Sequence, residues 1–74
     1  MNNERRKQIA KAMDLIQDAR DILQDVRDDE ECAFDNLPEG LQYSEKGENM
    51  EDNVSILEEQ IDVLENVIDE VQEL

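Results

Sequence analysis

The sequence contains no histidine and no tryptophan, and it has only one cysteine, Cys32, and one proline, Pro38. A single cysteine excludes a disulfide within the chain and fits a reducing compartment. Without histidine, a zinc site would need carboxylates and one thiol, which is a rare ligand set, so we expect no bound metal. The chain also lacks a histidine base, a glycine-rich phosphate loop and a nucleophile motif. We therefore expect no enzymatic activity and no cofactor.

Long apolar runs are also missing, and basic residues are scarce. No stretch approaches the roughly 20 apolar residues that a membrane-spanning helix needs, and the basic residues 5–7 lead into an alternating pattern that does not resemble a signal peptide. We expect a soluble, cytoplasmic protein with no membrane partner. The 22 acidic residues outnumber the 7 basic ones, which gives a formal net charge of -15. This charge argues against direct binding to nucleic acid or to anionic lipid, because both require a positive surface.

The first half of the chain has a regular apolar pattern. Positions three and four residues apart are apolar from Ile9 to Val26, which is the a/d stripe of an amphipathic helix. The six positions are Ile9, Ala12, Ile16, Ala19, Leu23 and Val26. Leu15 and Ile22 widen the stripe on one side and Met13 widens it on the other. A stripe of this width exceeds what one partner helix can cover, which favours a bundle over a two-stranded coil.

The second half repeats this pattern and adds to it. Its stripe consists of Val54, Leu57, Ile61, Leu64, Ile68 and Val71. Further apolar residues beside it, including Leu74, extend the apolar arc to nearly half of the helix circumference. Part of this arc would stay exposed in a monomer, and exposed apolar patches usually mark an interface. We predict that the interface between copies of the chain contains Leu15, Ile22, Ile56, Val63 and Val67.

These patterns predict an all-α fold, an antiparallel helical hairpin that assembles into a homo-oligomeric helical bundle. A chain of 74 residues has room for one domain, and a domain this small is marginally stable alone. The predicted parts of this single domain, residues 1–74, are a first helix over about 3–31, a loop over about 32–43 and a second helix over about 44–74.

Capping residues suggest where the helices begin. Asn3 is the expected N-cap of the first helix, and Ser44 or Asn49 that of the second. Gly47 weakens the earlier of these two starts. Within the loop, the run from Asn36 to Gly40 suggests a short helical turn, with proline early and glycine at its close.

The charges run against the helix dipoles. Residues 5–7 are basic at the start of the first helix, and residues 48–74 contain ten acids and no base. An antiparallel hairpin places the basic start beside the acidic end of the second helix. We expect Arg5, Arg6 or Lys7 to pair there with Glu70 or Glu73.

Arg20 and Arg27 lie one heptad apart beside the apolar stripe. The sequence allows two roles for these arginines. They can pair with Glu58 and Glu65 of the second helix, or they can hold an anionic ligand at an interface between copies through bidentate contacts.

Phe34 and Tyr43, the only aromatic residues, bracket the loop. They either fold back over the end of the bundle or form a stacking surface for a flat ligand. Asn36 and Ser44 add polar groups near a helix N-terminus, where phosphates bind favourably.

The loop Phe34–Gln42, with the sequence FDNLPEGLQ, continues into Ser44–Glu48, with the sequence SEKGE. This loop resembles a recurring signature of small proteins from phages and mobile elements of Gram-positive bacteria, which share the layout of a basic-start helix, this loop and an acidic second helix. The resemblance spans essentially the whole chain and implies a phage-type accessory protein of the bacterial cytoplasm, in an infected or host cell. It implies that the loop is more than a spacer, and it carries over no catalytic residue.

In this context the leading hypothesis is a homo-oligomer that sequesters a small anionic ligand, most plausibly a host immune-signalling nucleotide. The candidate ligand-binding residues are Arg20, Arg27, Phe34, Asn36, Tyr43 and Ser44. Two alternatives remain open. One is an acidic inhibitor that binds a protein or mimics DNA, and the other is a purely structural or regulatory bundle.

Overall fold

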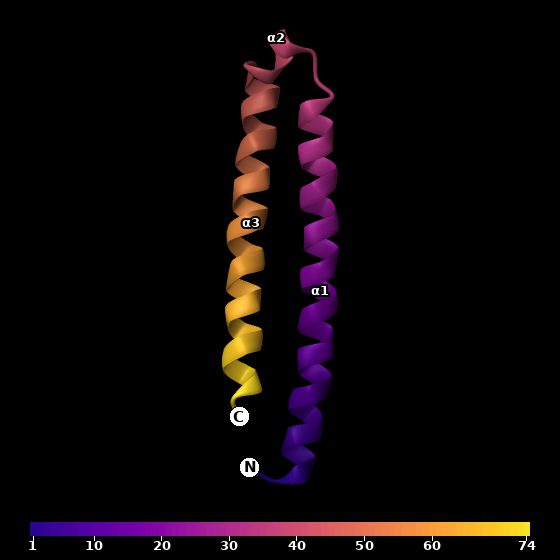
Figure 1. The fold of residues 1–74 in the computed structure, drawn as a ribbon, viewed down its shortest axis with the longest axis vertical. Helices are drawn as coiled ribbons and strands as arrows, with labels where there is room; N and C mark the ends of the chain where they lie inside the picture. Colours follow the sequence, from indigo (N-terminus) through magenta and orange to yellow (C-terminus); the bar gives the residue numbers. More distant parts are fainter.

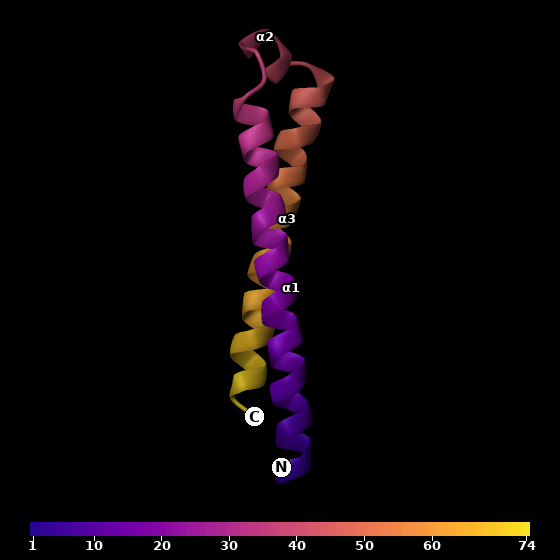
Figure 2. The same cartoon turned by 90° about the vertical axis from the view of Figure 1, so that its right-hand side faces the viewer.

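Two long antiparallel helices lie side by side and are joined by a short helix at one end (Figure 1). The structure, a computed structural model, describes all 74 residues. Helix α1 spans Asn3–Asp35, α2 spans Glu39–Gln42 and α3 spans Glu45–Gln72. The molecule is a rod with extents of 58 × 15 × 12 Å, and its long helices cross at a shallow angle in the view turned by 90° (Figure 2). This confirms the all-helical fold and the antiparallel packing of the two long helices. No helix is long and apolar enough to cross a membrane.

Helix α1 begins one residue earlier than expected. Asn2 has extended backbone angles (φ -81°, ψ 170°), and its side-chain oxygen accepts a hydrogen bond from the backbone N–H of Arg5 at 2.9 Å. Asn2 is therefore the N-cap, and Asn3 is the first helical residue. An asparagine oxygen at this position satisfies one of the donors that every helix start leaves free.

Helix α1 also ends later than expected, because residues 32–35, assigned to the loop from the sequence, form its last turn. The backbone N–H of Asn36 still donates to the Cys32 carbonyl at 3.1 Å. Pro38 stops the helix soon afterwards, because it lacks an N–H and disfavours helical geometry in the residue before it. The predicted short turn is present as α2, which starts directly after Pro38 and has Gly40 inside it instead of at its close.

Ser44 is the N-cap of α3, so the earlier of the two expected starts is the one that forms. Its hydroxyl accepts from the Gly47 N–H at 3.4 Å and donates to the Leu41 carbonyl. The Gln42 side chain ties α2 to the end of α1 by donating to the carbonyls of Phe34 and Leu37, each at 3.3 Å.

Gly47 does not weaken this start, contrary to expectation. Gly47 is buried, and a Cβ atom there would lie 2.1 Å from the carbonyl oxygen of Gln42. Only a residue without a side chain permits this approach. The chain reversal at the end of the rod therefore depends on glycine at this position.

The side of α3 that faces α1 is the one that the sequence predicts. Its stripe residues are half-buried or buried: Val54, Leu57, Ile61, Leu64, Ile68 and Val71. Ile61 is only 4% exposed, and its counterpart on α1 with the lowest exposure is Met13 at 8%. These two are the only buried hydrophobic residues, because two helices cannot enclose a larger core.

Helix α1 is rotated relative to its predicted stripe. Its less exposed residues along the contact are Ile9, Met13, Ile16, Arg20, Leu23 and Arg27, whereas Ala12, Ala19 and Val26 are exposed. The prediction of an a/d seam on this helix was therefore half wrong, because positions a and e face α3 and the d positions face outward. The physical reason is that the two arginines at e reach acidic partners on α3, as described below.

Candidate functional site

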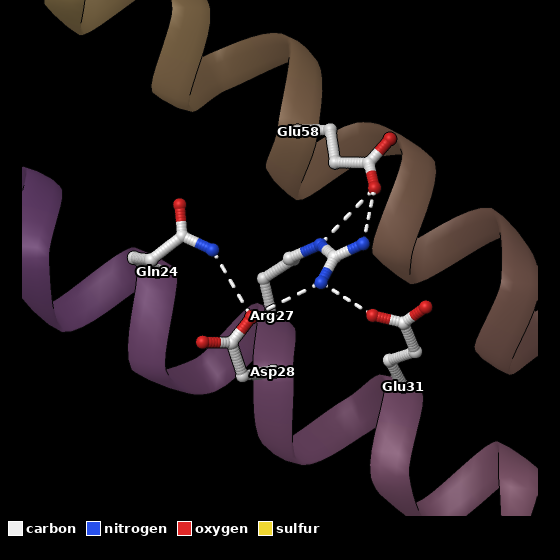
Figure 3. Close-up of polar contacts among 5 residues, drawn as sticks. All are labelled: Gln24, Arg27, Asp28, Glu31 and Glu58. Carbon is white, nitrogen blue, oxygen red and sulfur yellow. Dashed lines mark hydrogen bonds and ion pairs between the residues drawn. The ribbon is translucent and has the colours of Figure 1, made fainter.

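One flank of the hairpin is closed by two Arg–Glu pairs, which we call the ion-pair flank. Arg20 Nε and Nη2 donate to the same carboxylate oxygen of Glu65, at 2.9 and 2.6 Å. Arg27 contacts Glu58 in the same way, at 3.0 and 2.6 Å, as Figure 3 shows. The pairs repeat at seven residues because both partners occupy the e position of their helices. They fix the register in which α1 and α3 lie.

The Arg27 guanidinium makes two further contacts with acids on its own helix. Its Nη1 group lies 3.0 Å from an oxygen of Asp28 and also contacts Glu31 (Figure 3). Hydrogen bonds to Glu58 and then to Asp28 raise the pKa of Arg27. In return, Arg27 and secondarily Gln24 lower the pKa of Asp28. All three nitrogen atoms of this guanidinium are thus occupied by carboxylates.

Arg20 is held similarly, with its Nη1 group 3.1 Å from Asp21. Hydrogen bonds to Glu65 and then to Asp21 raise its pKa. Of the two readings of these arginines, the structure shows the pairing with Glu58 and Glu65. Every nitrogen atom of both guanidinium groups already contacts a carboxylate of this chain.

The remaining candidate ligand residues are dispersed at the loop end. Phe34 is half-buried, Asn36 is the C-cap of α1 and Ser44 uses its hydroxyl as the cap of α3. Tyr43 is 78% exposed and does not line the one cavity found. Of the six candidates, only Arg27 and Phe34 lie at the same cavity.

This cavity, of about 340 Å³, lies where the ion-pair flank meets the loop end. Its eight lining residues are Arg27, Glu31, Phe34, Asp35, Glu51, Val54, Ser55 and Glu58. Four of them are acidic and one is basic, and that one already bonds to Glu58 and Glu31. The cavity is therefore negatively charged, which disfavours a phosphate or other anion. No group of three or more acidic or thiol side chains is arranged to hold a metal ion.

A set of apolar side chains is also exposed, and we call it the apolar face. It consists of Leu15, Ile22 and Val26 of α1, of Ile56, Val63 and Val67 of α3, and of Leu74 just beyond the end of α3. Val67 is half-buried, and the other six side chains are each between 47 and 62% exposed. All five residues predicted to form an interface belong to it.

The two halves of the apolar face lie on the same flank. On α1, the line of contact runs near Ile16, with Arg20 about 40° to one side and Leu15 and Ile22 about 100–120° to the other. On α3 it runs near Leu64, with Glu65 about 100° to one side and Val63 about 100° to the other. Because the arginines meet the glutamates, both apolar stripes must lie on the flank opposite the ion pairs. The face therefore extends along one flank of the rod.

Val26 is the member of this face that sequence reasoning misassigned to the hairpin core. A signal for it was present. The residues Ala12, Leu15, Ala19, Ile22 and Val26 are themselves spaced three and four apart without a break. The first helix therefore has two overlapping apolar stripes, and the hairpin contact uses only one of them.

The basic start of α1 does not pair with the acidic end of α3, contrary to expectation. The five ion pairs of the structure all involve Arg20 or Arg27. Since Arg20 lies opposite Glu65, the end of α3 at Gln72 lies roughly level with Met13. Residues 5–7 therefore extend beyond the end of α3, as the position of the N-terminus in Figure 1 shows. We call this segment the basic overhang.

Compared with protein-family models, with curated proteins and with solved structures, the chain matches none of them.

Proposed function

We propose that the chain is a non-enzymatic interaction protein whose working form is a homo-oligomeric helical bundle. The apolar face carries this proposal. Burying apolar surface is worth about 25 cal/mol per Å², and contiguous exposed apolar patches mark interaction sites. Four-helix bundles are the usual way to cover such stripes on a helical hairpin.

The geometry supports this role better than capture of a small anionic ligand. Arg20 and Arg27, the two cations nearest to the proposed ligand site, already bind carboxylates, and the cavity beside Phe34 is lined mainly by acids. Sequestration of a signalling nucleotide stays a hypothesis. Native mass spectrometry of the protein as purified from cells distinguishes the two, because a retained nucleotide would favour sequestration.

The proposal is tested by measuring mass in solution across protein concentration, with light scattering after size exclusion. The double substitution Ile22→Gln with Val63→Gln removes the centre of the apolar face, and we expect it to give monomers. The matched control, Asp14→Gln with Glu59→Gln, places the same residue on the exposed polar surface and should leave the oligomer intact. A wild-type chain that is monomeric and fully helical at high micromolar concentration would contradict the proposal.

A second candidate function is capture of a basic protein, with the outer surface of α3 acting as a DNA mimic. Glu58 and Glu65 are engaged by arginines, but Glu59, Asp62 and Asp69 are exposed and take part in no ion pair. A surface of this charge suits a nucleic-acid-binding partner and not nucleic acid itself. The resemblance of the loop supports a phage-type accessory role in the cytoplasm of a bacterial cell.

Affinity capture from a bacterial lysate tests this candidate. A basic protein should be retained at low salt and released at about 0.5 M salt, where the screening length falls to a few ångströms. Glu59→Gln, Asp62→Asn and Asp69→Asn together should abolish retention. The control, Asp14→Asn, Asp18→Asn and Asp25→Asn on α1, makes the same change in charge and should not.

A further inference from the structure

We infer that the apolar face binds a second copy of this chain in the opposite direction, which forms an antiparallel four-helix dimer. The inference rests on the proposed self-association and specifies its subunit number, its orientation and its register. In this dimer the loop end of each hairpin lies beside the N-terminal end of the other. The shape of the apolar face and the charges of the rod both favour binding of a second copy.

The shape of the face suits a two-fold contact between identical surfaces. In such a contact both copies use the same residues. The surface must therefore be complementary to itself. Along α1 small residues precede the larger ones, with Ala12 before Leu15 and Ala19 before Ile22 and Val26. The alanines leave room in which the larger side chains of the second copy can pack. The three-four spacing on both helices is that of bundle-forming helices.

The charges of the rod select the orientation. The end that carries the N-terminus bears four basic residues without an ion-pair partner, Arg5, Arg6, Lys7 and Lys11. The loop end is strongly acidic: it contains Asp28, Asp29, Glu30, Glu48, Glu51 and Asp52. Two hairpins docked in the same direction would bring their acidic ends together, at a cost in repulsion. Opposite directions place the basic start of α1 in each copy beside the acidic loop end of the other, which is the complementary arrangement.

The register follows from the position of the apolar face. On α1 the face, with its alanines, runs from Ala12 to Val26, so a two-fold axis through its middle passes near Ala19. At 1.5 Å per residue, Lys11 of one copy is then roughly level with Asp28 of the other. The basic overhang of each copy is likewise roughly level with the last turn of the other copy's α1. The overhang, which extends past α3 in its own chain, thus meets acidic surface in the second copy.

The native Cys32 provides the test, because it is the only cysteine, is exposed and lies outside the apolar face. Spin labels on it should be about 40 Å apart in the antiparallel dimer, since each lies about 13 residues from the axis near Ala19. A separation below about 20 Å, roughly two interaxial spacings of packed helices, would show parallel docking and overturn the inference while leaving self-association intact. Labels at Asp18→Cys in a Cys32→Ser background, close to the axis, should give a short distance and confirm that labelled dimers are present.

Mass measurements distinguish the antiparallel dimer from self-association in general. A monomer at high micromolar concentration overturns both, and a mass above that of a dimer overturns the inference alone. Replacing the overhang charges, with Arg5→Gln, Arg6→Gln and Lys7→Gln together, should weaken the dimer about tenfold without loss of helix, because three exposed pairs are lost at each of its two equivalent ends and no ion pair is lost within a chain. The control Lys46→Gln removes a positive charge at the loop end and should not weaken it. Equal dissociation constants for the triple variant and the wild type would contradict the predicted register.

Discussion

Gly47 lies in the first turn of α3, directly beneath the end of α2. Alanine usually stabilises a helix relative to glycine by about 1 kcal/mol, but a Cβ here would lie 2.1 Å from the backbone oxygen of Gln42. Because backbone atoms cannot rotate aside, α2 would have to move. We expect Gly47→Ala to lower the free energy of unfolding by about 1–3 kcal/mol, the usual cost of overpacking. Urea unfolding followed by circular dichroism at fixed protein concentration measures this.

Gly40 supplies the matched control for this substitution. It also lies in a helix, but nothing comes within 4 Å of the position of its Cβ. Gly40→Ala should therefore be neutral or stabilising by up to about 1 kcal/mol. If the two alanine variants were equally stable, the close approach at Gly47 would not limit the fold.

The pKa of the Asp28 carboxyl tests whether Arg27 keeps its contacts in solution. Arg27 first, and Gln24 second, hold the pKa of its carboxyl below the ordinary value of 3.8. A depressed pKa means that the contact stabilises the fold above pH 3.8 and that this stability is lost as the pH falls through the lower folded value. Carbon-detected NMR titration should therefore show the lowered pKa in the wild type and a rise toward 3.8 in Arg27→Gln.

The variant Arg20→Gln serves as the comparison for that titration. It removes the neighbouring ion pair with Glu65 but leaves Arg27 beside Asp28. The pKa of Asp28 should stay low in this variant. A pKa at the ordinary value in the wild type would mean that the Arg27–Asp28 contact is not maintained in solution.

At the scale of the helices, the N-caps Asn2 and Ser44 should contribute unequally to stability. Ser44 begins α3 in the middle of the chain, whereas Asn2 begins the overhang of α1. We expect Ser44→Ala to cost about 1 kcal/mol of stability, the usual value for a lost cap, because α3 cannot fray without disturbing the loop. Asn2→Ala should fray only the first turn and leave the urea midpoint almost unchanged.

Replacement by another capping residue separates the cap from other roles of Ser44. Asp accepts the same hydrogen bond from the Gly47 N–H and also favours the helix N-terminus. Ser44→Asp should therefore retain wild-type stability. Equal losses in the Ala and Asp variants would indicate that the bond from Ser44 to Leu41, and not the cap, is what matters.

The helices and their antiparallel order were predictable, because apolar spacing reports directly on which face of a helix is buried. The stripe of α3 was predicted residue by residue for the same reason. The rotation of α1 was not, since its apolar residues occupy the a, d, e and g positions and two stripes fit the pattern equally well. The choice between them is made by Arg20 and Arg27, whose contacts join distant parts of the sequence.

The loop end was predicted less well, for a related reason. Propensity gives no signal for the last turn of α1, in which Cys32, Ala33 and Phe34 continue the helix until Pro38 approaches. The need for glycine at position 47 also arises from tertiary structure, because it depends on where the Gln42 carbonyl lies. Local sequence reads Gly47 only as a weak helix former.

For the whole molecule, size and shape set the main constraint. Only 3 of 74 residues are buried, so a single hairpin gains little hydrophobic stabilisation against the entropy of ordering its chain. A net charge of -15 adds self-repulsion. Covering the apolar face is the most direct way for such a chain to gain stability, and it would also double the number of helices around one core.

A dimer joined through the apolar face can be recognised from its overall dimensions. A single hairpin has a radius of gyration of 17.1 Å and a length of 58 Å, whereas a compact domain of this size would have a radius of about 11 Å. Two hairpins joined through the apolar face share the same long axis. We therefore expect small-angle X-ray scattering to show twice the mass of the chain, a thicker cross-section and a maximum dimension that stays close to the length of one hairpin. Contact through the exposed Leu41 and Tyr43 at the loop end would instead nearly double that length, so a dimer of about twice the hairpin length would show that the ends and not the apolar face hold the copies together.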